Sequence, residues 1–194
     1  MNRRGFTITE LLISFTIVAM VAANISMVLR TTSSAYEAGV FAVRLEDQAE
    51  QTIDRISYAL MSSKADELNP DLVDGMHASH IRYQMSLGVE ADGEFILSDV
   101  ERIALVHAER SVVWSENPDE ERERRVVWTR NVAPYQQGEV FNGLDDNGNG
   151  LTDEEGLCFD KLGSSVRIRL LLEGEDSKGT EYSILKRNIV TCRN

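Results

Sequence analysis

The chain has 194 residues, of which 42% are hydrophobic and 27% charged, so it is long enough for one ordinary domain with a hydrophobic core. This balance excludes collagen-like, low-complexity and wholly disordered chains. The 20 Lys and Arg stand against 32 Asp and Glu, for a net charge of −12, and a surface this acidic repels the phosphates of nucleic acid. We therefore expect no nucleic-acid partner.

The first predicted element is an apolar segment from Phe6 to Leu29, which contains one charged residue, Glu10, and neither Gly nor Pro. As a helix this segment is roughly 36 Å long, enough to cross a bilayer core of about 30 Å. Arg3 and Arg4 precede it and the acidic remainder follows it. The positive-inside tendency then predicts a single-pass protein with a cytoplasmic N-terminus and an extracytoplasmic bulk.

Glu10 is the feature of this segment that a simple anchor does not explain. A carboxylate near the start of an apolar helix costs on the order of 2–3 kcal/mol unless it is paired or neutralised. Cleavage of the peptide bond between Gly5 and Phe6 would create a new α-amino group about one helical turn from Glu10, on the same helix or on a neighbouring one. The pattern indicates a device for assembly.

The run Arg4-Gly5-Phe6-Thr7-Ile8-Thr9-Glu10-Leu11-Leu12 resembles the class III leader of type IV pilins and type II secretion pseudopilins. The resemblance implies that a prepilin peptidase cuts after Gly5 and methylates Phe6, and that Glu10 complements the terminal amine of an adjacent subunit. It also implies other pilins or pseudopilins, an inner-membrane assembly platform and membrane lipid as partners. The implied location is the bacterial inner membrane, with a periplasmic or extracellular head, and a filament after assembly.

Two alternatives to this interpretation remain open. The first is a secretory signal cut after Val21-Ala22-Ala23, before Asn24, and the second is an uncleaved anchor. The apolar stretch, however, continues past Asn24, and Glu10 is unusual in a signal peptide.

The next predicted element is an amphipathic helix over residues 30–68, which contain no Pro and only one Gly. Its apolar side chains recur every three or four residues and form one stripe: Phe41, Leu45, Ala49, Ile53, Ile56 and Leu60. We expect this stripe to pack on a sheet of the same head. Continuity with the apolar segment resembles the long N-terminal helix of pilins.

After the turn at Asn69-Pro70-Asp71 the pattern changes to short runs typical of β-strands. They are residues 80–87, 94–97, 102–107, 111–114, 125–129, 165–172 and 182–190. Turn-forming stretches at 91–93, 117–124 and 174–179 predict antiparallel hairpins. The fold class is therefore α+β and resembles the pilin-like fold, with leader 1–5, transmembrane helix 6–29, amphipathic helix 30–68 and β-rich head 69–194.

The loop over residues 145–156 contains five carboxylates and matches most of an EF-hand calcium loop, with Gly150 at the sharp-turn position. The predicted oxygen ligands are Asp145, Asn147, Asn149, the Leu151 carbonyl and Asp153. Position 12 is Gly156, so the last ligand would come from Glu154, Glu155 or Asp160. We expect a structural Ca²⁺ here that orders the loop, and the alternative is a solvated Asn/Asp/Gly turn.

Cys158 and Cys192 are the two cysteines, and an extracytoplasmic location favours an intrachain disulfide over two buried thiols. No catalytic residues are predicted, because the chain has no GxSxG, P-loop, HExxH or GxGxxG motif.

The function that these features favour is structural: a minor pilin-like subunit assembled through its N-terminal helix into a type II secretion pseudopilus or type IV pilus-like filament that supports protein secretion. A large acidic head, and Met27 where major pilins commonly carry proline, resemble the J-type minor pseudopilin. A minor type IV pilin or a competence-type pseudopilin is a close alternative. The rival class is a secreted or anchored calcium-binding module that does not form filaments.

Overall fold

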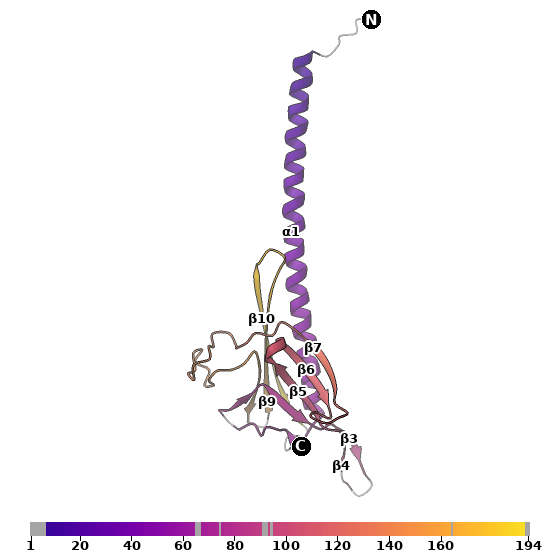
Figure 1. The fold of residues 1–194 in the computed structure, drawn as a ribbon, viewed down its shortest axis with the longest axis vertical. Coiled ribbons are helices and arrows are strands. Elements are labelled where there is room, and N and C mark those ends of the chain that lie inside the picture. The colour runs from indigo at the N-terminus through magenta and orange to yellow at the C-terminus, as the bar shows by residue number, and fades with distance from the viewer. Residues whose placement is uncertain are drawn as a thin grey trace. The chain divides into compact units, whose positions relative to one another are not determined.

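The computed structural model describes residues 7–64, 67–73, 75–90, 93, 95–163 and 165–192. Helix α1 spans Ile8–Met61 (Figure 1). The chain divides into two units, Met1–Ala42 and Val43–Asn194. The first unit holds the apolar part of α1, and the second holds the end of α1 and the strands.

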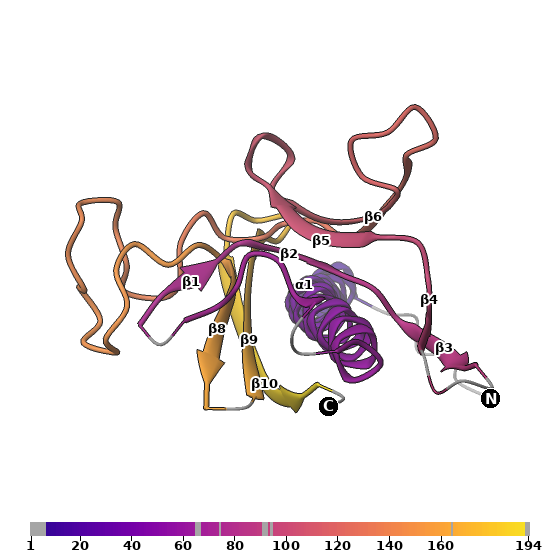
Figure 2. The same cartoon turned by 90° about the horizontal axis from the view of Figure 1, so that it is seen from below.

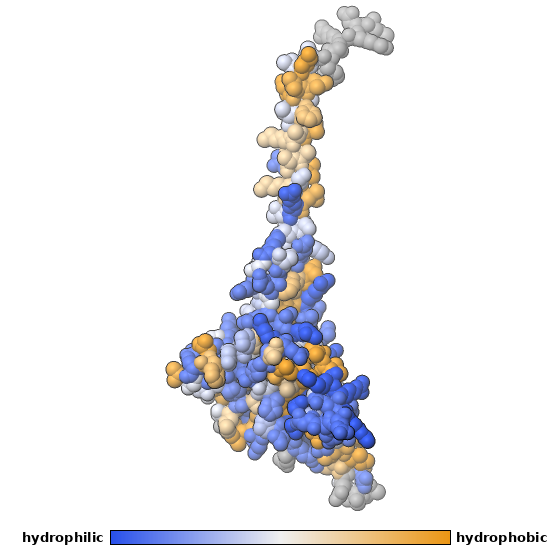
Figure 3. All heavy atoms as spheres, viewed as in Figure 1, coloured by the Kyte–Doolittle hydropathy of each residue, from blue (hydrophilic) through white to orange (hydrophobic). Residues whose placement is uncertain are grey.

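The apolar part of α1 is covered by no other described residue of the chain. Its large side chains between Ile8 and Leu29 are all more than half exposed, and Figure 3 shows them as an apolar surface along this part of the helix. Polar side chains within it bond to the helix itself: Thr16 Oγ1 donates to the Ile13 carbonyl at 2.8 Å, and Asn24 Nδ2 to the Met20 carbonyl at 2.8 Å. Such bonding suits a helix in lipid, where water cannot satisfy polar groups.

The second unit contains antiparallel strands in two four-stranded sheets and one hairpin. One sheet has the order β1-β8-β9-β10, formed by His77–Ala78, Leu157–Leu162, Ser165–Glu175 and Glu181–Thr191. The other has the order β2-β5-β6-β7, formed by His80–Tyr83, Glu101–Val106, Ser111–Glu116 and Arg124–Thr129. Strands β3 (Ser86–Val89) and β4 (Phe95–Leu97) form the hairpin, and the 3-10 helix η2 is His107–Glu109. The α+β class expected from the sequence is confirmed.

The end of α1 packs against the strands of its own unit, as the apolar stripe predicted. Leu45, Ala49, Ile53, Ile56 and Leu60 are all buried. Figure 2 shows this part of α1 end-on, with β5 and β6 on one side and β8, β9 and β10 on another. Polar contacts fix β10 to the helix: Lys186 Nζ lies 2.9 Å from Glu46 Oε1, and Asn188 Nδ2 donates to Ser57 Oγ at 2.8 Å.

Helix α1 ends at Met61, before the predicted limit at residue 68. Two serines follow it, and Ser63 Oγ donates back to the Leu60 carbonyl at 2.8 Å. Ser63 then forms an isolated β-bridge with Met85, and the N–H of Ser86 donates to the Ser62 carbonyl at 3.0 Å. Pairing with this strand segment replaces the next helical turn.

The strands differ from the prediction in two ways, although all three hairpins are confirmed. The single strand predicted over residues 80–87 is two strands, because the chain leaves β2 at Gln84 and β3 pairs with β4 instead. Strands β1 and β8 were not predicted. In β8 the first four residues, Leu157 to Asp160, are all buried, so no alternation of polar and apolar residues marks it.

Candidate functional site

The N-terminus of α1 is organised by a reciprocal cap between Thr7 and Glu10. The backbone N–H and the Oγ1 of Thr7 each donate to Glu10 Oε2 at 2.9 Å, and the N–H of Glu10 donates to Thr7 Oγ1 at 3.3 Å. This is a capping box, which satisfies backbone donors that a helix start otherwise leaves unpaired. The Thr-x-x-Glu spacing in the sequence carries this role, and our sequence analysis missed it.

The cap changes how the charge of Glu10 is accommodated. Both bonds that Glu10 accepts end on Oε2, which leaves Oε1 without a hydrogen-bond partner among the described residues. Glu10 is exposed, so that oxygen is accessible to a neighbouring molecule. Gly5 and Phe6, the predicted processing residues, lie outside the described residues.

The same helix provides the membrane candidate. Within the described residues, α1 is the one helix that is long and apolar enough to span a membrane, and none of its apolar window is buried.

The acidic loop is built around Asp145. Its Oδ1 accepts the N–H of Gly148 at 2.7 Å and of Asn149 at 3.1 Å, while Oδ2 accepts the N–H of Gly150 at 2.8 Å. These hydrogen bonds, first of all the one from Gly150, hold the pKa of Asp145 below its usual range. Gly148 and Gly150 have φ of 74° and 90°, which favours glycine and lets the loop fold back on the carboxylate.

The two asparagines predicted as ligands bond to the loop itself. Asn147 Oδ1 accepts the N–H of Asn149 at 3.1 Å, and Asn149 Oδ1 accepts the N–H of Leu151 at 3.0 Å. The carboxylate of Asp153 bonds outside this turn. It accepts hydrogen bonds from the backbone N–H groups of Asn142 and Gly143.

The residues proposed to close the calcium cage are paired with basic side chains of the protein. Glu154 is fully buried, and its Oε1 lies 2.8 Å from Arg169 Nη1. Glu155 Oε1 lies 3.1 Å from His107 Nε2, and Asp160 pairs with Arg167 and Arg169. Among the described residues, no group of three or more His, Cys, Asp or Glu side chains is arranged to hold a metal ion. Calcium binding stays a prediction from the sequence.

Glu139 lies outside the predicted loop but binds to it, a role that sequence reasoning missed. It is buried, its Oε1 accepts the N–H of Asn147 at 3.0 Å, and its Oε2 accepts the N–H of Asp153 at 3.1 Å. One carboxylate thus joins the two halves of the loop. No local pattern signals this role, since Glu139 precedes the EF-hand match and reaches it only in the fold.

The predicted disulfide between Cys158 and Cys192 is wrong for this fold, in which both thiols are free and buried. Cys158 in β8 lies opposite Arg169, which lies opposite Arg187 in β10, and Cys192 follows five residues later. The two cysteines are therefore separated by about 17 Å along the strands and about 10 Å across them. A disulfide requires Cα atoms within about 7 Å. Burial raises the pKa of the Cys158 thiol to about 12, so the thiol stays protonated.

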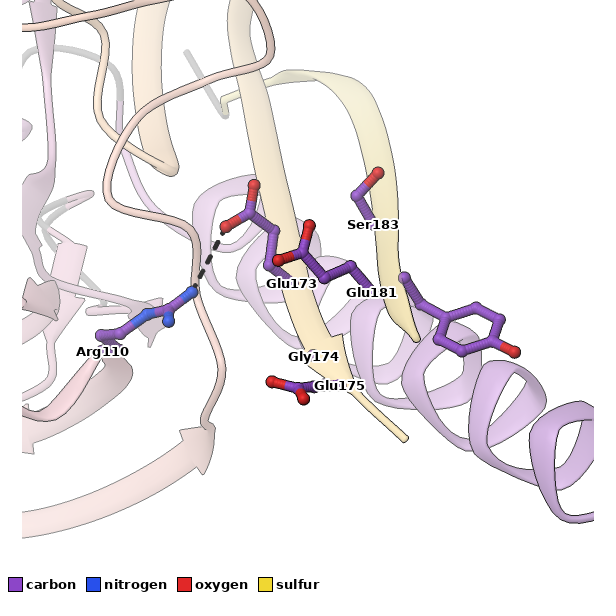
Figure 4. Close-up of a pocket in the computed structure, with 7 residues that line it drawn as sticks. Arg110, Glu173, Gly174, Glu175, Glu181 and Ser183 are labelled. Carbon is purple, nitrogen blue, oxygen red and sulfur yellow. Dashed lines mark hydrogen bonds and ion pairs between the residues drawn. The ribbon is translucent and has the colours of Figure 1, made fainter. Parts of the chain in front are cut away.

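An acidic hollow lies beside the β9–β10 hairpin (Figure 4). Glu175 and Glu181 are opposite each other across the two strands, and Arg110 Nη2 donates to Glu173 Oε2 at 3.4 Å. No histidine or cysteine is among the described residues that line it. It is an electrostatic patch without a recognisable catalytic arrangement.

Comparison with known protein families decides what the N-terminus is. Residues 1–23 match the family model described as the prokaryotic N-terminal methylation motif. This is a prepilin-type N-terminus. The methylation motif supports a type IV pilin-like protein with a structural role, and with α1 it fits a membrane-anchored pilin that a prepilin peptidase processes. Neither the curated proteins nor the solved structures contain a match to the chain.

Proposed function

We propose that the chain is a minor pilin-like subunit that assembles through the apolar part of α1 into a type II secretion pseudopilus or a type IV pilus-like filament. The methylation motif over residues 1–23, which from Ile8 onward is the start of the exposed apolar helix α1, is the observation that carries the proposal. An apolar helix whose side chains are exposed among the described residues needs lipid before assembly and neighbouring helices after it. Of the two systems, the pseudopilus with a J-type role is the one that the sequence resemblance favours.

The processing chemistry follows from the same segment. Cleavage between Gly5 and Phe6 leaves a chain that begins one residue before the capping Thr7, so the helix cap survives processing. Oε1 of Glu10 then serves as the acceptor for the methylated amine of an adjacent subunit. Arg3 and Arg4 keep the leader in the cytoplasm, and the strand-rich unit lies outside it.

The decisive experiment is the intact mass and N-terminal sequence of the protein purified from its own membranes. A start at Phe6 with one additional methyl group, about 14 Da, is the expected result. A start at Asn24 would identify a secreted protein, and a start at Met1 would identify a simple anchor. Either of these outcomes contradicts the proposal.

A further inference from the structure

A groove rich in aromatic side chains runs between α1 and the sheet β2-β5-β6-β7 within the second unit. Tyr58 of α1, Tyr83 of β2, Trp114 of β6 and Trp128 of β7 line it. The chain has only 2 Trp and 5 Tyr, so both tryptophans and two of the tyrosines gather at this one place. Aromatic side chains dominate recognition surfaces, so this concentration makes the groove a candidate binding site.

The groove is open because β7 is the edge strand of its sheet. Val126, which pairs in register with Trp114, is 39% exposed, and Tyr58 across the groove is 68% exposed. The described residues therefore leave the inner face of the sheet accessible at this edge, while its centre is covered.

The floor of the groove holds a carboxylate with an unused oxygen. Glu101 is only 6% exposed, and its Oε2 accepts hydrogen bonds from Trp114 Nε1 at 2.6 Å and from the Tyr83 hydroxyl at 2.7 Å. Oε1 of Glu101 has no hydrogen-bond partner in the part of the chain that the structure describes. Burial, together with Glu101, raises the pKa of Tyr83, so the tyrosine remains a donor that fixes the carboxylate in place.

The chemistry of the groove favours a cation. Glu101 and Asp54 contribute two negative charges to the lining and Arg55 contributes one positive charge. Aromatic faces attract ammonium and guanidinium groups, and more strongly where water is excluded. The two hydrogen bonds that Glu101 accepts both end on Oε2, so a charged donor that enters the groove would pair with Oε1. The net charge of −12 adds a long-range attraction for basic partners.

We propose that this groove binds an Arg or Lys side chain presented by a neighbouring polypeptide. The rings of Tyr58, Trp114 and Trp128 contact the alkyl stem, and Glu101 Oε1 receives the guanidinium or ammonium group. The groove belongs entirely to the second unit, so this binding does not depend on the proposed filament. Its failure would leave the processing and assembly proposal unaffected.

The two tryptophans provide the readout, because both lie in the groove. Full-length protein in detergent is titrated with a capped Leu-Arg-Leu peptide, and tryptophan fluorescence is recorded. We expect a saturable change with a Kd below about 1 mM. The matched neutral peptide, with citrulline in place of arginine, should bind at least tenfold more weakly. Equal binding of the two peptides, or no change with either, would overturn the proposal.

Variants locate the charge that the cation contacts. Glu101→Gln should weaken binding of the arginine peptide at least tenfold. Asp54→Asn, at an exposed position on α1, should weaken it about threefold. Glu181→Gln, an equal change of charge on β10 outside the groove, should have no effect. If circular dichroism shows that Glu101→Gln does not fold, Asp54→Asn decides. If the folded variant binds the arginine peptide as tightly as the wild-type protein does, the assignment is contradicted.

Discussion

Arg169 shows how much one side chain contributes to this head. The run Val166-Arg167-Ile168-Arg169-Leu170 alternates apolar and basic residues, yet Arg169 is buried. Its guanidinium contacts Glu154 at 2.8 Å and Asp160 at 3.2 Å, so one residue of β9 joins the acidic loop to β8. The buried Glu154 is compensated by this arginine, and the buried Asp160 is compensated by Arg169 and Arg167 together.

Substitution of Arg169 tests that connection. Arg169→Met should lower the free energy of unfolding by about 3–5 kcal/mol, because it leaves the buried carboxylate of Glu154 without a cation and Asp160 with Arg167 alone. Arg187→Met, at the exposed position opposite Arg169 in β10, is the matched control and should change stability by less than about 0.5 kcal/mol. Urea unfolding of the full-length protein in detergent measures both. Similar losses in the two variants would show that the ion network does not carry stability.

At the scale of elements, α1 combines two surfaces that serve different surroundings. Up to Leu29 its apolar side chains are exposed on all sides, whereas from Leu45 to Leu60 only one stripe is apolar and that stripe is buried. A helix that is apolar all round is typical of a membrane span, and an amphipathic helix is typical of a packed surface. The sequence predicted this change of pattern, and the acidic loop is the other element that it singled out.

Ile56 tests the packed part of the helix. It is fully buried, so Ile56→Ala should lower the free energy of unfolding by about 2–5 kcal/mol through lost burial and the cavity that remains. Val43→Ala, on an exposed position of the same helix, should cost less than about 1 kcal/mol. Urea unfolding compares them. Equal effects would mean that this stripe does not pack as described.

The loop around Asp145 provides a test of the calcium prediction. Titration of the full-length protein with Ca²⁺ in a calorimeter should give heat that is lost in Asp145→Ala, because this carboxylate occupies the first ligand position. Asp71→Ala, an exposed carboxylate outside the loop, should bind as the wild type does. The absence of heat with the wild-type protein would show that the hydrogen bonds to Asp145 and the pairing of Glu154 with Arg169 satisfy the loop without a metal.

At the scale of the whole molecule, the N-terminal motif and the exposed apolar helix both point to assembly. Glu10 has two roles in this scheme: it completes the cap with Thr7 and it offers an oxygen to a neighbouring subunit. The two roles are separable, because the cap needs the threonine hydroxyl and the pairing does not.

Assembly of Glu10 and Thr7 variants distinguishes the roles. In cells that form filaments of the wild-type protein, Glu10→Ala should remain in the membrane with a folded head and lose incorporation, since the amine of the neighbour then lies in lipid without a counter-charge. Thr7→Ala, which weakens the cap by about 1 kcal/mol, should still assemble. Incorporation is measured by the fraction of protein in sheared filaments. Equal loss in both variants would assign Glu10 to the cap alone.

The sequence by itself determined the N-terminal motif, the apolar helix, the amphipathic stripe and the α+β class, because these features depend on local order and periodicity. Only the tertiary structure decided the end of α1 at Met61, the hidden strand β8, the burial of Arg169 and the role of Glu139. The separation of Cys158 from Cys192 also depends on strand register. The aromatic groove belongs to this second group, since Tyr58, Glu101, Trp114 and Trp128 come from distant parts of the chain. The partners of buried charges and aromatic rings come from segments distant in the sequence, and a local sequence pattern does not specify them.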